Sequence, residues 1–535
     1  MEISLNLQIE EIIIETMERK EKYAIGQQDF RMLREAGAVY VDKTEFIERI
    51  IHSGLRYYFL ARPRRFGKSL FLSTLRYFFE GRRELFSGLY IDSVDWEWKS
   101  YPVLRLDLNM DRYDEPGILD GIVSNLFREW EEKYEVPVID TNISVRFRNI
   151  IKAAHEKSGL PVVILVDEYD KPLVGYLNKG ENFEHYRSRL ASLYSNFKSS
   201  AEHIRLVFMT GVSRFSKLSV FSDLNNIVDI TFSDEYADIC GITEQELFEN
   251  LKEGIELLAL KRRWSNEQVK IELKKNYDGY RFAPDGSDIY NPWSVLNWLN
   301  NFRIANYWNH TGLPTLIAES LKNIDSDLEK VFNTRCRVDL LMGLDLMDLN
   351  PVALLYQTGY LTIKEYDFDT DIITLGIPNR EVKEGLMNTL LPYYVKVRRG
   401  TVSDTIFAIN DNIMSGNPEA FMKELQVYFA GIPYELKMDN ENNFQNAFYI
   451  LVSLIGIKAH AEVSMSSGRI DLLIETPKYV YVIELKYDHS AETALKQIEE
   501  RGYSLPYEAD GRKIFKIGVS FSSKTRRIES WKIAE

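Results

Sequence analysis

The stretch YYFLARPRRFGKSLFLSTLRYFF at residues 57–79 carries the most informative pattern of the chain. Its first residues, 57–61, have the length and apolar composition of a buried strand. A basic loop follows and ends in Gly67-Lys68-Ser69, after which apolar residues recur at helical spacing. The stretch therefore predicts a strand, a loop and a helix that begins near Lys68.

Such a loop has the chemistry needed to hold nucleotide phosphates. Exposed backbone N–H groups and a helix N-terminus bind the phosphates, a lysine contacts the terminal ones, and a hydroxyl binds Mg²⁺. Lys68 and Ser69 occupy the positions that these roles require, although Arg62 replaces the first glycine of the GxxxxGK[ST] pattern. The alternative is a basic helix start without a ligand. The predicted nucleotide-binding residues of the loop are Arg62, Pro63, Arg64, Arg65, Phe66, Gly67, Lys68 and Ser69.

A second motif, VVILVDEYD at residues 162–170, reads as a buried strand that ends in carboxylates. Asp167 is placed to hold Mg²⁺ through water, and Glu168 is placed to polarise the attacking water as a catalytic residue. A buried strand that happens to end in an acidic turn is the alternative. Because both motifs stand in the expected order at strand ends, we predict ATP and Mg²⁺ as cofactors.

The run RLVFMT at residues 205–210 is expected to lie between the two strands that carry these motifs. Thr210 ends this run and is predicted to bind the nucleotide, and either Thr210 or Ser213 would read the terminal phosphate. Arg214 follows, either as a sensor of the phosphate or as an ordinary ion-pair residue.

Apolar runs of strand length recur through the first half of the chain and are separated by helical stretches. Strands that are apolar on both faces and alternate with helices predict a mostly parallel, doubly wound α/β sheet. The runs are YYFLA at 57–61, VLRLDL at 103–108, VVILVD at 162–167, RLVFMT at 205–210 and IVDITF at 227–232.

Several segments resemble the bacterial and archaeal AAA-ATPase-like family, which characteristically carries an arginine in place of the first P-loop glycine. The resemblance covers nearly the whole chain. It implies ATP binding and a P-loop architecture, but it does not indicate a biological role. The segments are VDKTEFIERI at 41–50, RPRRFGKSLFLSTL at 62–75, LVDEYDKP at 165–172, TGVSRFSKLSVFSDLNNIVDIT at 210–231, NYDGYRF at 276–282 and YNPWSV at 290–295.

A third motif lies near the C-terminus, in GRIDLLIETPKYVYVIELKYD at residues 468–488. A turn near 476–478 would join two strands, and strand alternation puts Glu484 and Lys486 on one face, where a hairpin can bring Asp471 beside them. The two carboxylates would bind Mg²⁺ or Mn²⁺, while Lys486 would orient or deprotonate the attacking water. We predict all three as catalytic residues, with Asp471 and Glu484 as metal ligands. The alternative is an amphipathic hairpin with solvated neighbours.

This motif resembles the PD-(D/E)XK nuclease superfamily. Gln497 and Tyr503 match the accessory QxxxY-like position, and Glu441 is a candidate further ligand. Nuclease-like folds can also persist as binding modules without catalysis. The nearby basic residues can contact nucleic-acid phosphates or form a solvated face: Lys513, Lys516, Lys524, Arg526 and Arg527.

The remaining patterns divide the chain into four expected parts. Between the two motif regions the sequence is helical and aromatic-rich, and it then gives a helix with the strands TGYLTI and DIITLGIP. We expect the aromatics Tyr277, Tyr280, Trp293 and Trp298 to form a helical core rather than a base-stacking platform. The parts are a P-loop ATPase domain at 1–235, a helical lid at 236–330, a winged-helix-like region at 331–430 and an α/β nuclease-like domain, similar to restriction endonucleases, at 431–535.

Composition limits the class of protein further. The net charge of -14 argues against a surface that coats nucleic acid nonspecifically, but residues 461–535 carry 12 Lys/Arg against 12 Asp/Glu. Cys240 and Cys336 stand far apart, which indicates a reducing cytoplasm and no zinc site, and the longest apolar runs predict no membrane span.

The function predicted from these observations is ATP-regulated, metal-dependent cleavage of nucleic acid. The alternatives are an ATP-switched binding or signalling protein with an inactive nuclease-like module, and an ATPase that acts on protein partners, alone or as an oligomer.

Overall fold

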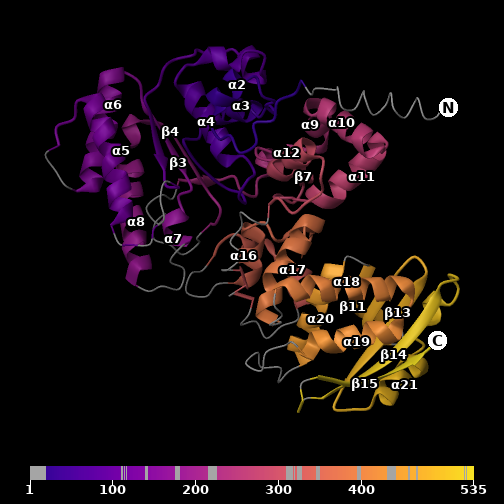
Figure 1. The fold of residues 1–535 in the computed structure, drawn as a ribbon. Coiled ribbons are helices and arrows are strands. Elements are labelled where there is room, and N and C mark those ends of the chain that lie inside the picture. The colour runs from indigo at the N-terminus through magenta and orange to yellow at the C-terminus, as the bar shows by residue number, and fades with distance from the viewer. Residues whose placement is uncertain are drawn as a thin grey trace, which may run out of the picture. The chain divides into compact units, whose positions relative to one another are not determined.

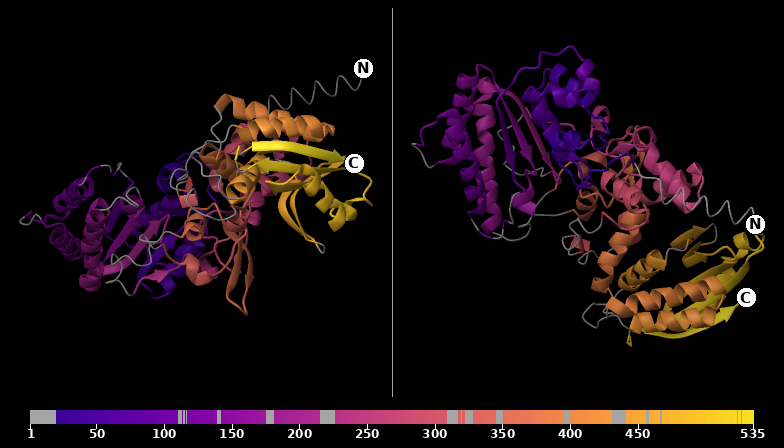
Figure 2. Two further views of the ribbon diagram at one scale, coloured as in Figure 1. Left: turned by 90° about the horizontal axis from the view of Figure 1, so that it is seen from below. Right: turned by 45° about the horizontal axis from the view of Figure 1, so that its top comes forward.

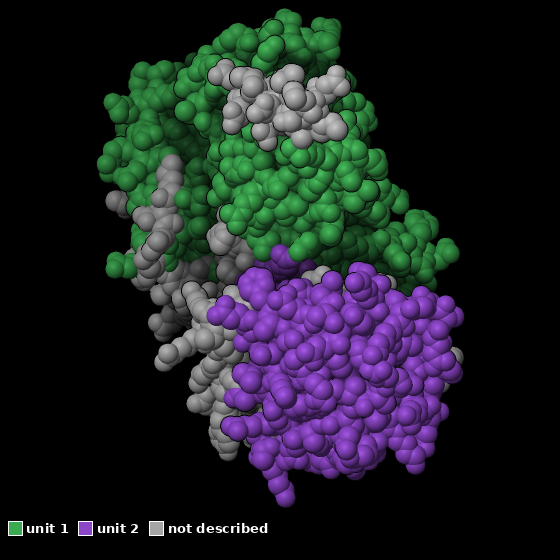
Figure 3. All heavy atoms as spheres, turned by 45° about the vertical axis from the view of Figure 1, so that its right-hand side comes forward, with its two compact units in different colours: residues 1–312, 335–382 green, residues 313–334, 383–535 purple. Residues whose placement is uncertain are grey.

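The chain folds into two compact units (Figure 3), residues 1–312 with 335–382 as unit 1 and residues 313–334 with 383–535 as unit 2. These units are coarser than the four expected parts, and the region 331–430 contributes to both of them; the four-part division stays a prediction. The computed structural model describes residues 20–109, 113, 115, 117–138, 142–174, 181–214, 226–308, 317–318, 320–321, 328–344, 350–394, 399–430, 441–455, 458–465, 468–522, 524–525 and 527–535.

A five-stranded parallel sheet forms the centre of the first half of the chain (Figure 1). Its strand order is β2-β3-β4-β1-β5, so the strand of RLVFMT does lie between the two motif strands. The prediction of a parallel α/β sheet is confirmed. The strands are β1 (Tyr57–Ala61), β2 (Val103–Asp107), β3 (Val162–Asp167), β4 (Ile204–Gly211) and β5 (Val228–Asp229).

The fifth strand is much shorter than the run 227–232 predicts. Thr231 explains the difference, because its hydroxyl accepts from the Ala61 N–H at 3.0 Å and its carbonyl accepts from the Arg62 guanidinium at 2.8 Å. These groups are taken out of the sheet ladder, so β5 ends after two residues.

Helices cover both faces of this sheet, as a doubly wound fold requires. Neighbouring β1 side chains show the two faces: the Tyr57 hydroxyl donates to the Phe197 carbonyl of α8, while the Tyr58 hydroxyl contacts Ser53 after α3. The helices are α2 (Phe30–Glu35), α3 (Glu45–His52), α4 (Lys68–Phe79), α5 (Ile118–Tyr134), α6 (Ile143–Ser158), α7 (Lys171–Val174) and α8 (Glu181–Ser199), with 3₁₀ helices η1 (Arg83–Phe86), η2 (Tyr90–Ser93), η3 (Ala201–His203) and η4 (Asp234–Tyr236).

The expected helical region follows the sheet and packs around its own apolar core. Capping boxes start two of its helices, at Thr243 with Glu246 and at Ser265 with Gln268. Tyr277, Tyr280 and Trp298 are buried, as predicted. The elements are β6 (Ile242–Thr243), α9 (Glu244–Asn250), α10 (Lys252–Arg262), α11 (Asn266–Tyr277), β7 (Ile289–Tyr290) and α12 (Pro292–Asn301).

A small antiparallel sheet completes unit 1, with strand order β8-β10-β9. The strand expected from DIITLGIP is β10, whereas TGYLTI shares only Thr362 and Ile363 with β9, which begins later than predicted and runs on to Asp367. Strands β9 and β10 pair as an antiparallel hairpin. The elements are β8 (Arg335–Arg337), α15 (Val338–Leu341), α16 (Pro351–Gln357), β9 (Thr362–Asp367) and β10 (Ile372–Gly376).

Unit 2 is built on a mixed sheet of order β11-β12-β13-β14-β15, in which only the β13–β14 pair is parallel among the described strands. Strands β12 and β13 are the hairpin predicted from residues 468–488, whereas β15 was missed. The elements are α14 (Leu328–Phe332), α18 (Arg399–Ser415), α19 (Pro418–Ala430), α20 (Glu441–Ile455), β11 (Lys458–Met465), β12 (Gly468–Glu475), β13 (Tyr479–Tyr487), α21 (Ala491–Arg501), η6 (Leu505–Tyr507), β14 (Lys513–Ser522) and β15 (Arg527–Ala534).

Helices α19 and α21 pack on opposite faces of this sheet (Figure 2). On β14, the ring of Phe521 meets Phe429 of α19, whereas a side chain at Gly518 would overlap the Ala491 carbonyl of α21. The two positions differ by an odd number and so face opposite sides. Helix α17 (Arg380–Tyr394) has its first three residues in unit 1 and the others in unit 2. No helix in the described part of the chain is long and apolar enough to cross a membrane.

Candidate functional site

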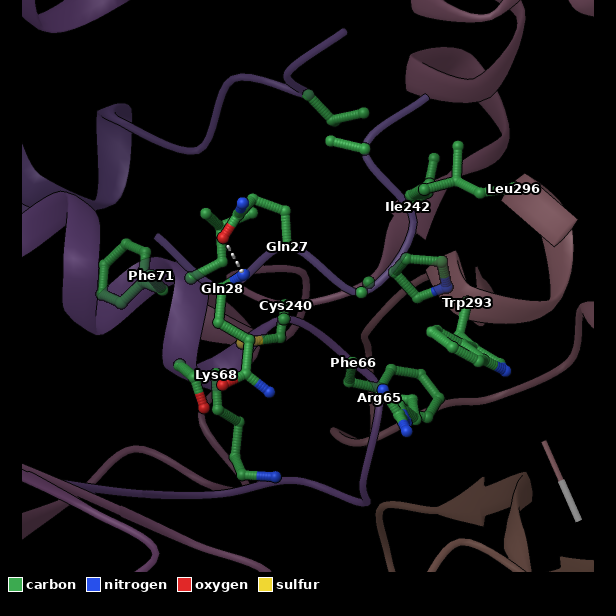
Figure 4. A pocket seen from close by; sticks show the side chains of 18 of the residues that line it. Gln27, Gln28, Arg65, Phe66, Lys68, Phe71, Cys240, Ile242, Trp293 and Leu296 are labelled. Atoms are coloured by element: carbon green, nitrogen blue, oxygen red, sulfur yellow. Dashed lines mark hydrogen bonds between the residues drawn. The ribbon is translucent and has the colours of Figure 1, made fainter. Parts of the chain in front are cut away.

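A cavity of about 520 Å³ opens where β1 passes into the loop and α4 (Figure 4). The loop forms one part of its wall, and Figure 4 shows Gln27 and Gln28 across from Ile242, Trp293 and Leu296 of the helical region. The loop and the segments that follow the strands supply further polar residues of the wall: Arg64, Arg65, Lys68, Ser69, Asn109, Glu168 and Lys171.

The loop curls around its own lysine. Lys68 is 5% exposed, and its ammonium donates to the carbonyls of Arg62 at 2.9 Å and Pro63 at 3.1 Å. Gly67 has φ +103°, a conformation that L side chains rarely adopt, and it precedes the first residue of α4. The Lys68 ammonium is therefore held by two neutral carbonyl oxygens, which an anionic phosphate can replace.

Arg62 takes no part in the wall of the cavity. Its guanidinium, 1% exposed, donates to the carbonyls of Ala61, Thr231, Tyr236 and Ala237, and lies over the ring of Phe282 at 4.6 Å. Burial lowers the pKa of Arg62. The side chain that replaces the first glycine thus points into the protein and ties the base of the loop to Thr231 and η4. Its main chain is engaged as well, because the Arg62 N–H donates to the Gly211 carbonyl at 3.1 Å. Pro63 also stays outside the cavity wall.

The carboxylates predicted for the metal and the water lie at the end of β3. The Thr210 hydroxyl donates to Asp167 at 2.8 Å, and Arg105 of β2 approaches Asp167 at 3.6 Å. Glu168 lines the cavity and has φ +49°, an unusual conformation for a residue other than glycine. The structure therefore brings Asp167 and Thr210 together and places Glu168 at the same wall as Lys68 and Ser69.

Asp170 fixes the turn that follows β3. This carboxylate is 1% exposed and accepts from the backbone N–H groups of Val212 and Ser213 at 3.1 and 2.7 Å, while burial raises its pKa to about 6. Ser213 thus contributes its backbone here. Arg214 forms an ion pair with Asp229 at 2.8 Å and does not line the cavity, which is the ion-pair alternative given from the sequence.

Aromatic side chains support the loop in a way that the sequence did not reveal. Trp293 lines the cavity instead of joining the helical core, and the Arg65 guanidinium lies 3.9 Å from its ring. Trp308, fully buried, donates from its indole to the Arg64 carbonyl at 3.1 Å. Its backbone N–H donates to Glu381, the second residue of α17, at 2.8 Å. Helical periodicity cannot separate a tryptophan in a core from one at a cavity wall.

A separate cluster lies in unit 2, on β12 and β13. The Leu485 N–H donates to Asp471 at 2.8 Å, and the Lys486 ammonium contacts Glu484 at 2.9 Å. The hairpin brings the three predicted residues together, since Leu472 pairs with Ile483 one position before Glu484. Burial raises the pKa of Glu484, against the lowering effect of Lys486.

Helix α21 packs on the face of the sheet that carries this cluster. Gln497 donates to the same Glu484 oxygen as Lys486, so the accessory glutamine reaches the site. Gly518 permits this approach, because a Cβ there would lie 2.2 Å from the Ala491 carbonyl. Tyr503 instead packs in the apolar core beneath the helix. The side chain of Glu441 lies outside the described residues.

The chemistry of this cluster fits a divalent ion. Glu484 is 1% exposed, and its second carboxylate oxygen has no hydrogen-bond partner within the described residues. Mg²⁺ is commonly bound by one or two carboxylates and several waters. Groups of three or more His, Cys, Asp or Glu suited to a metal are absent from the described residues, so Asp471 and Glu484 would hold an ion as a pair.

The basic residues beyond this cluster are mostly solvated. Lys513 pairs with Glu535 at 2.5 Å, and Lys524 and Arg527 are exposed. Lys516 is half-buried, and Arg526 lies outside the described residues. Their contact with nucleic acid stays a prediction.

Two known protein families match the regions of the chain that hold these two groups of residues. A family described as Predicted AAA-ATPase matches residues 24–221, and the PD-(D/E)XK nuclease superfamily matches residues 439–531. Fold and motifs thus define the class, an AAA-ATPase-like region joined to a nuclease-superfamily domain. A protein of Azotobacter chroococcum mcd 1, named "Uncharacterized protein in vnfD 5'region", is 34% identical over 526 residues, 96% of this chain and 98% of that protein. The chain belongs to this AAA-ATPase-like family with a C-terminal PD-(D/E)XK nuclease-like domain.

Proposed function

We propose that the protein binds and hydrolyses ATP in the cavity of unit 1, and that unit 2 cleaves nucleic acid with Mg²⁺ or Mn²⁺. One observation carries the proposal: Lys68, Ser69 and Glu168 line a single cavity at the carboxyl end of the parallel strands. Asp167, the residue before Glu168, is held there by Thr210. Ligands of such sheets bind at the carboxyl ends of the strands.

In unit 1, Ser69 and Asp167 would hold Mg²⁺, which neutralises phosphate charge when it is bound. Lys68 exchanges its two carbonyl partners for phosphate oxygens, and the N-terminus of α4 adds further N–H donors. Glu168 orients the water that attacks the terminal phosphorus and takes up its proton. Thr210 keeps Asp167 in place through the 2.8 Å hydrogen bond.

In unit 2, Asp471 and Glu484 would hold the divalent ion, which activates water and stabilises the phosphate charge. Lys486, which contacts Glu484 at 2.9 Å, would orient the attacking water. Gln497 keeps the Glu484 carboxylate aligned.

We further propose that nucleotide state regulates unit 2. The supporting contacts lie within unit 1, where the Arg64 carbonyl of the loop accepts from Trp308, and Trp308 in turn donates to Glu381. Glu381 belongs to α17, the helix whose later residues form part of unit 2. A change of the loop on nucleotide binding can therefore alter the start of that helix.

The test uses the purified full chain. Calorimetry with ATP and Mg²⁺ should give an affinity that Lys68→Ala weakens at least about a hundredfold, because two charge-assisted hydrogen bonds are lost. Lys198→Ala, at an exposed position of α8, is the matched control and should bind like wild type. DNA and RNA cleavage are measured with and without ATP, in Mg²⁺ and in Mn²⁺.

Equal ATP affinities of wild type and Lys68→Ala contradict the nucleotide site. Wild type that cuts neither DNA nor RNA under these conditions contradicts the nuclease and favours a binding module in its place. Cleavage that is independent of ATP leaves both activities and removes the regulation.

A further inference from the structure

We propose that Lys171 is a second cation for the terminal phosphate of ATP and acts in catalysis from the same chain. This inference rests on the proposed nucleotide site and goes beyond it by naming a residue that distinguishes ATP from ADP. Lys171 lines the same cavity as Lys68, Ser69 and Glu168.

The backbone of Lys171 is fixed next to the carboxylate that would polarise water. Its N–H donates to the Glu168 carbonyl at 3.0 Å, and the following turn is closed by Leu173 and Val174 donating to the Asp170 carbonyl. The Asp170 side chain is bonded to the end of β4. The Tyr169 hydroxyl donates to the Ser213 carbonyl at 2.9 Å. The base of the lysine is thus held by both neighbouring strands, whereas its long side chain remains adjustable.

The cations of the cavity wall differ in what already holds them. Lys43 is paired with Glu246 at 2.6 Å, Arg65 lies on Trp293, and Lys68 is bonded to two carbonyls. Arg64 is engaged within the protein as well. The Lys171 ammonium makes neither a hydrogen bond nor an ion pair within the described residues. A half-buried lysine at the wall of the cavity, whose ammonium has no partner among the described residues, has its charge available for an anionic ligand.

Hydrolysis of ATP needs a positive charge near the terminal phosphate. Arg214, the residue that the sequence suggested for this role, is engaged elsewhere. Arg214 is paired with Asp229 at 2.8 Å and does not line the cavity. Charge on the transferred phosphoryl oxygens is stabilised in related ATPases by an added cation. Lys171 stands three residues after Glu168, so one short turn places both the group that orients water and the cation.

The chemical step balances without further reactants. The water oxygen forms a bond to the terminal phosphorus, the bond from that phosphorus to the bridging oxygen breaks, and ADP and phosphate leave. Glu168 takes up the water proton. Lys171 donates hydrogen bonds to the terminal phosphate oxygens throughout and forms no covalent bond, so its contribution is electrostatic.

ADP lacks the phosphate that Lys171 would contact, and the ratio of the two affinities tests the proposal. Calorimetry with Mg²⁺ should show ATP binding weakened about tenfold in Lys171→Met, the loss expected of one charged hydrogen bond, with ADP affinity unchanged. Turnover of the variant should fall about a hundredfold or more. Lys171→Arg keeps the charge and should recover ATP over ADP selectivity, and Lys198→Met controls for loss of a lysine.

Equal losses for ATP and ADP, or a lowered melting temperature that Lys171→Arg does not restore, would show a structural lysine and overturn the inference. Unchanged selectivity for ATP over ADP, together with unchanged turnover in Lys171→Met, would also overturn the inference. If the wild-type protein binds neither ATP nor ADP, the proposed nucleotide site itself is contradicted. This result differs from the outcomes above, in which wild type still binds nucleotide.

Discussion

Lys68 of unit 1 and Lys486 of unit 2 are both held by oxygen atoms of the protein, but these oxygens differ in charge. Lys68 donates to two neutral backbone carbonyls, whereas Lys486 contacts the buried carboxylate of Glu484. Phosphate can replace the carbonyls and leave no charge behind. Separating Lys486 from Glu484 leaves an anion in a buried place, which is costly unless a cation takes over.

This difference assigns two kinds of site. Unit 1 has a lysine that is independent of its carboxylates and a cavity of about 520 Å³ around it. Unit 2 has a lysine and a carboxylate that act together, with Gln497 on the same oxygen. Substitutions should therefore separate binding from turnover in unit 1, while in unit 2 each single change should remove the whole activity.

The largest expected effect is in unit 2. Asp471→Ala should lower metal-dependent cleavage of nucleic acid on the order of a thousandfold, because a metal ligand and its transition-state stabilisation are lost. Lys486→Ala should lower cleavage by a similar factor. The attacking water then loses the group that positions it, and Glu484 loses its cationic partner. Rates are compared with Lys496→Ala, an exposed lysine of α21. ATP affinity should not change in any of them, and cleavage by both variants at the wild-type rate would contradict the site.

The next effect concerns the base of the loop in unit 1. Arg62→Met removes the donor to four backbone carbonyls and should lower the free energy of unfolding by about 3 kcal/mol. Urea unfolding followed by tryptophan fluorescence measures this, because only Trp531 of the eight tryptophans belongs to unit 2. The control is Arg83→Met, whose side chain is 61% exposed. Equal stability of the two variants would mean that the carbonyls find other donors.

A smaller change in free energy is expected for turnover in unit 1. Glu168→Gln removes the carboxylate that takes up the proton, and the rate of ATP hydrolysis should fall about a hundredfold. Binding of ATP should persist, because Asp167 and Lys68 are unchanged. Single-turnover assays and calorimetry separate these two quantities. A normal rate would assign the proton transfer to another group, for example Asp107 of β2, which is paired with Asp167 in the sheet.

The sequence predicted the strands and helices that carry the motifs because their apolar patterns are local. The order of β1, β3 and β4 and the hairpin of β12 and β13 followed from those patterns. Strand β15 was missed, since RIESWKIA shows little alternation that distinguishes it from a surface segment. The length of β5 was wrong, because the bonds that end it come from Ala61 and Arg62, which are far away in the sequence.

In the candidate sites too, the sequence predicted contacts between residues that are close in the chain and missed those that depend on distant residues. Residue type and spacing predicted which carboxylates meet which lysine, as at Glu484 and Lys486. The direction of Arg62 depends on carbonyls near residues 231–237, and the place of Trp293 depends on how α12 packs beside the loop. Lys171 lay within the quoted motif LVDEYDKP, but only the cavity distinguishes it from other surface lysines.

The last prediction concerns pH and the carboxylate behind the loop. Burial raises the pKa of Glu381 from 4.5 to about 7. The folded protein therefore keeps a proton there that the unfolded chain has lost, and the free energy of unfolding should fall as pH rises between these values. Glu381→Gln cannot ionise, so its stability relative to wild type should rise by about 2 kcal/mol from pH 5 to pH 8. Urea unfolding followed by tryptophan fluorescence at several pH values measures this difference, with the exposed Glu156→Gln as control. A difference that does not change with pH would show that Glu381 is already ionised in the folded protein at pH 5.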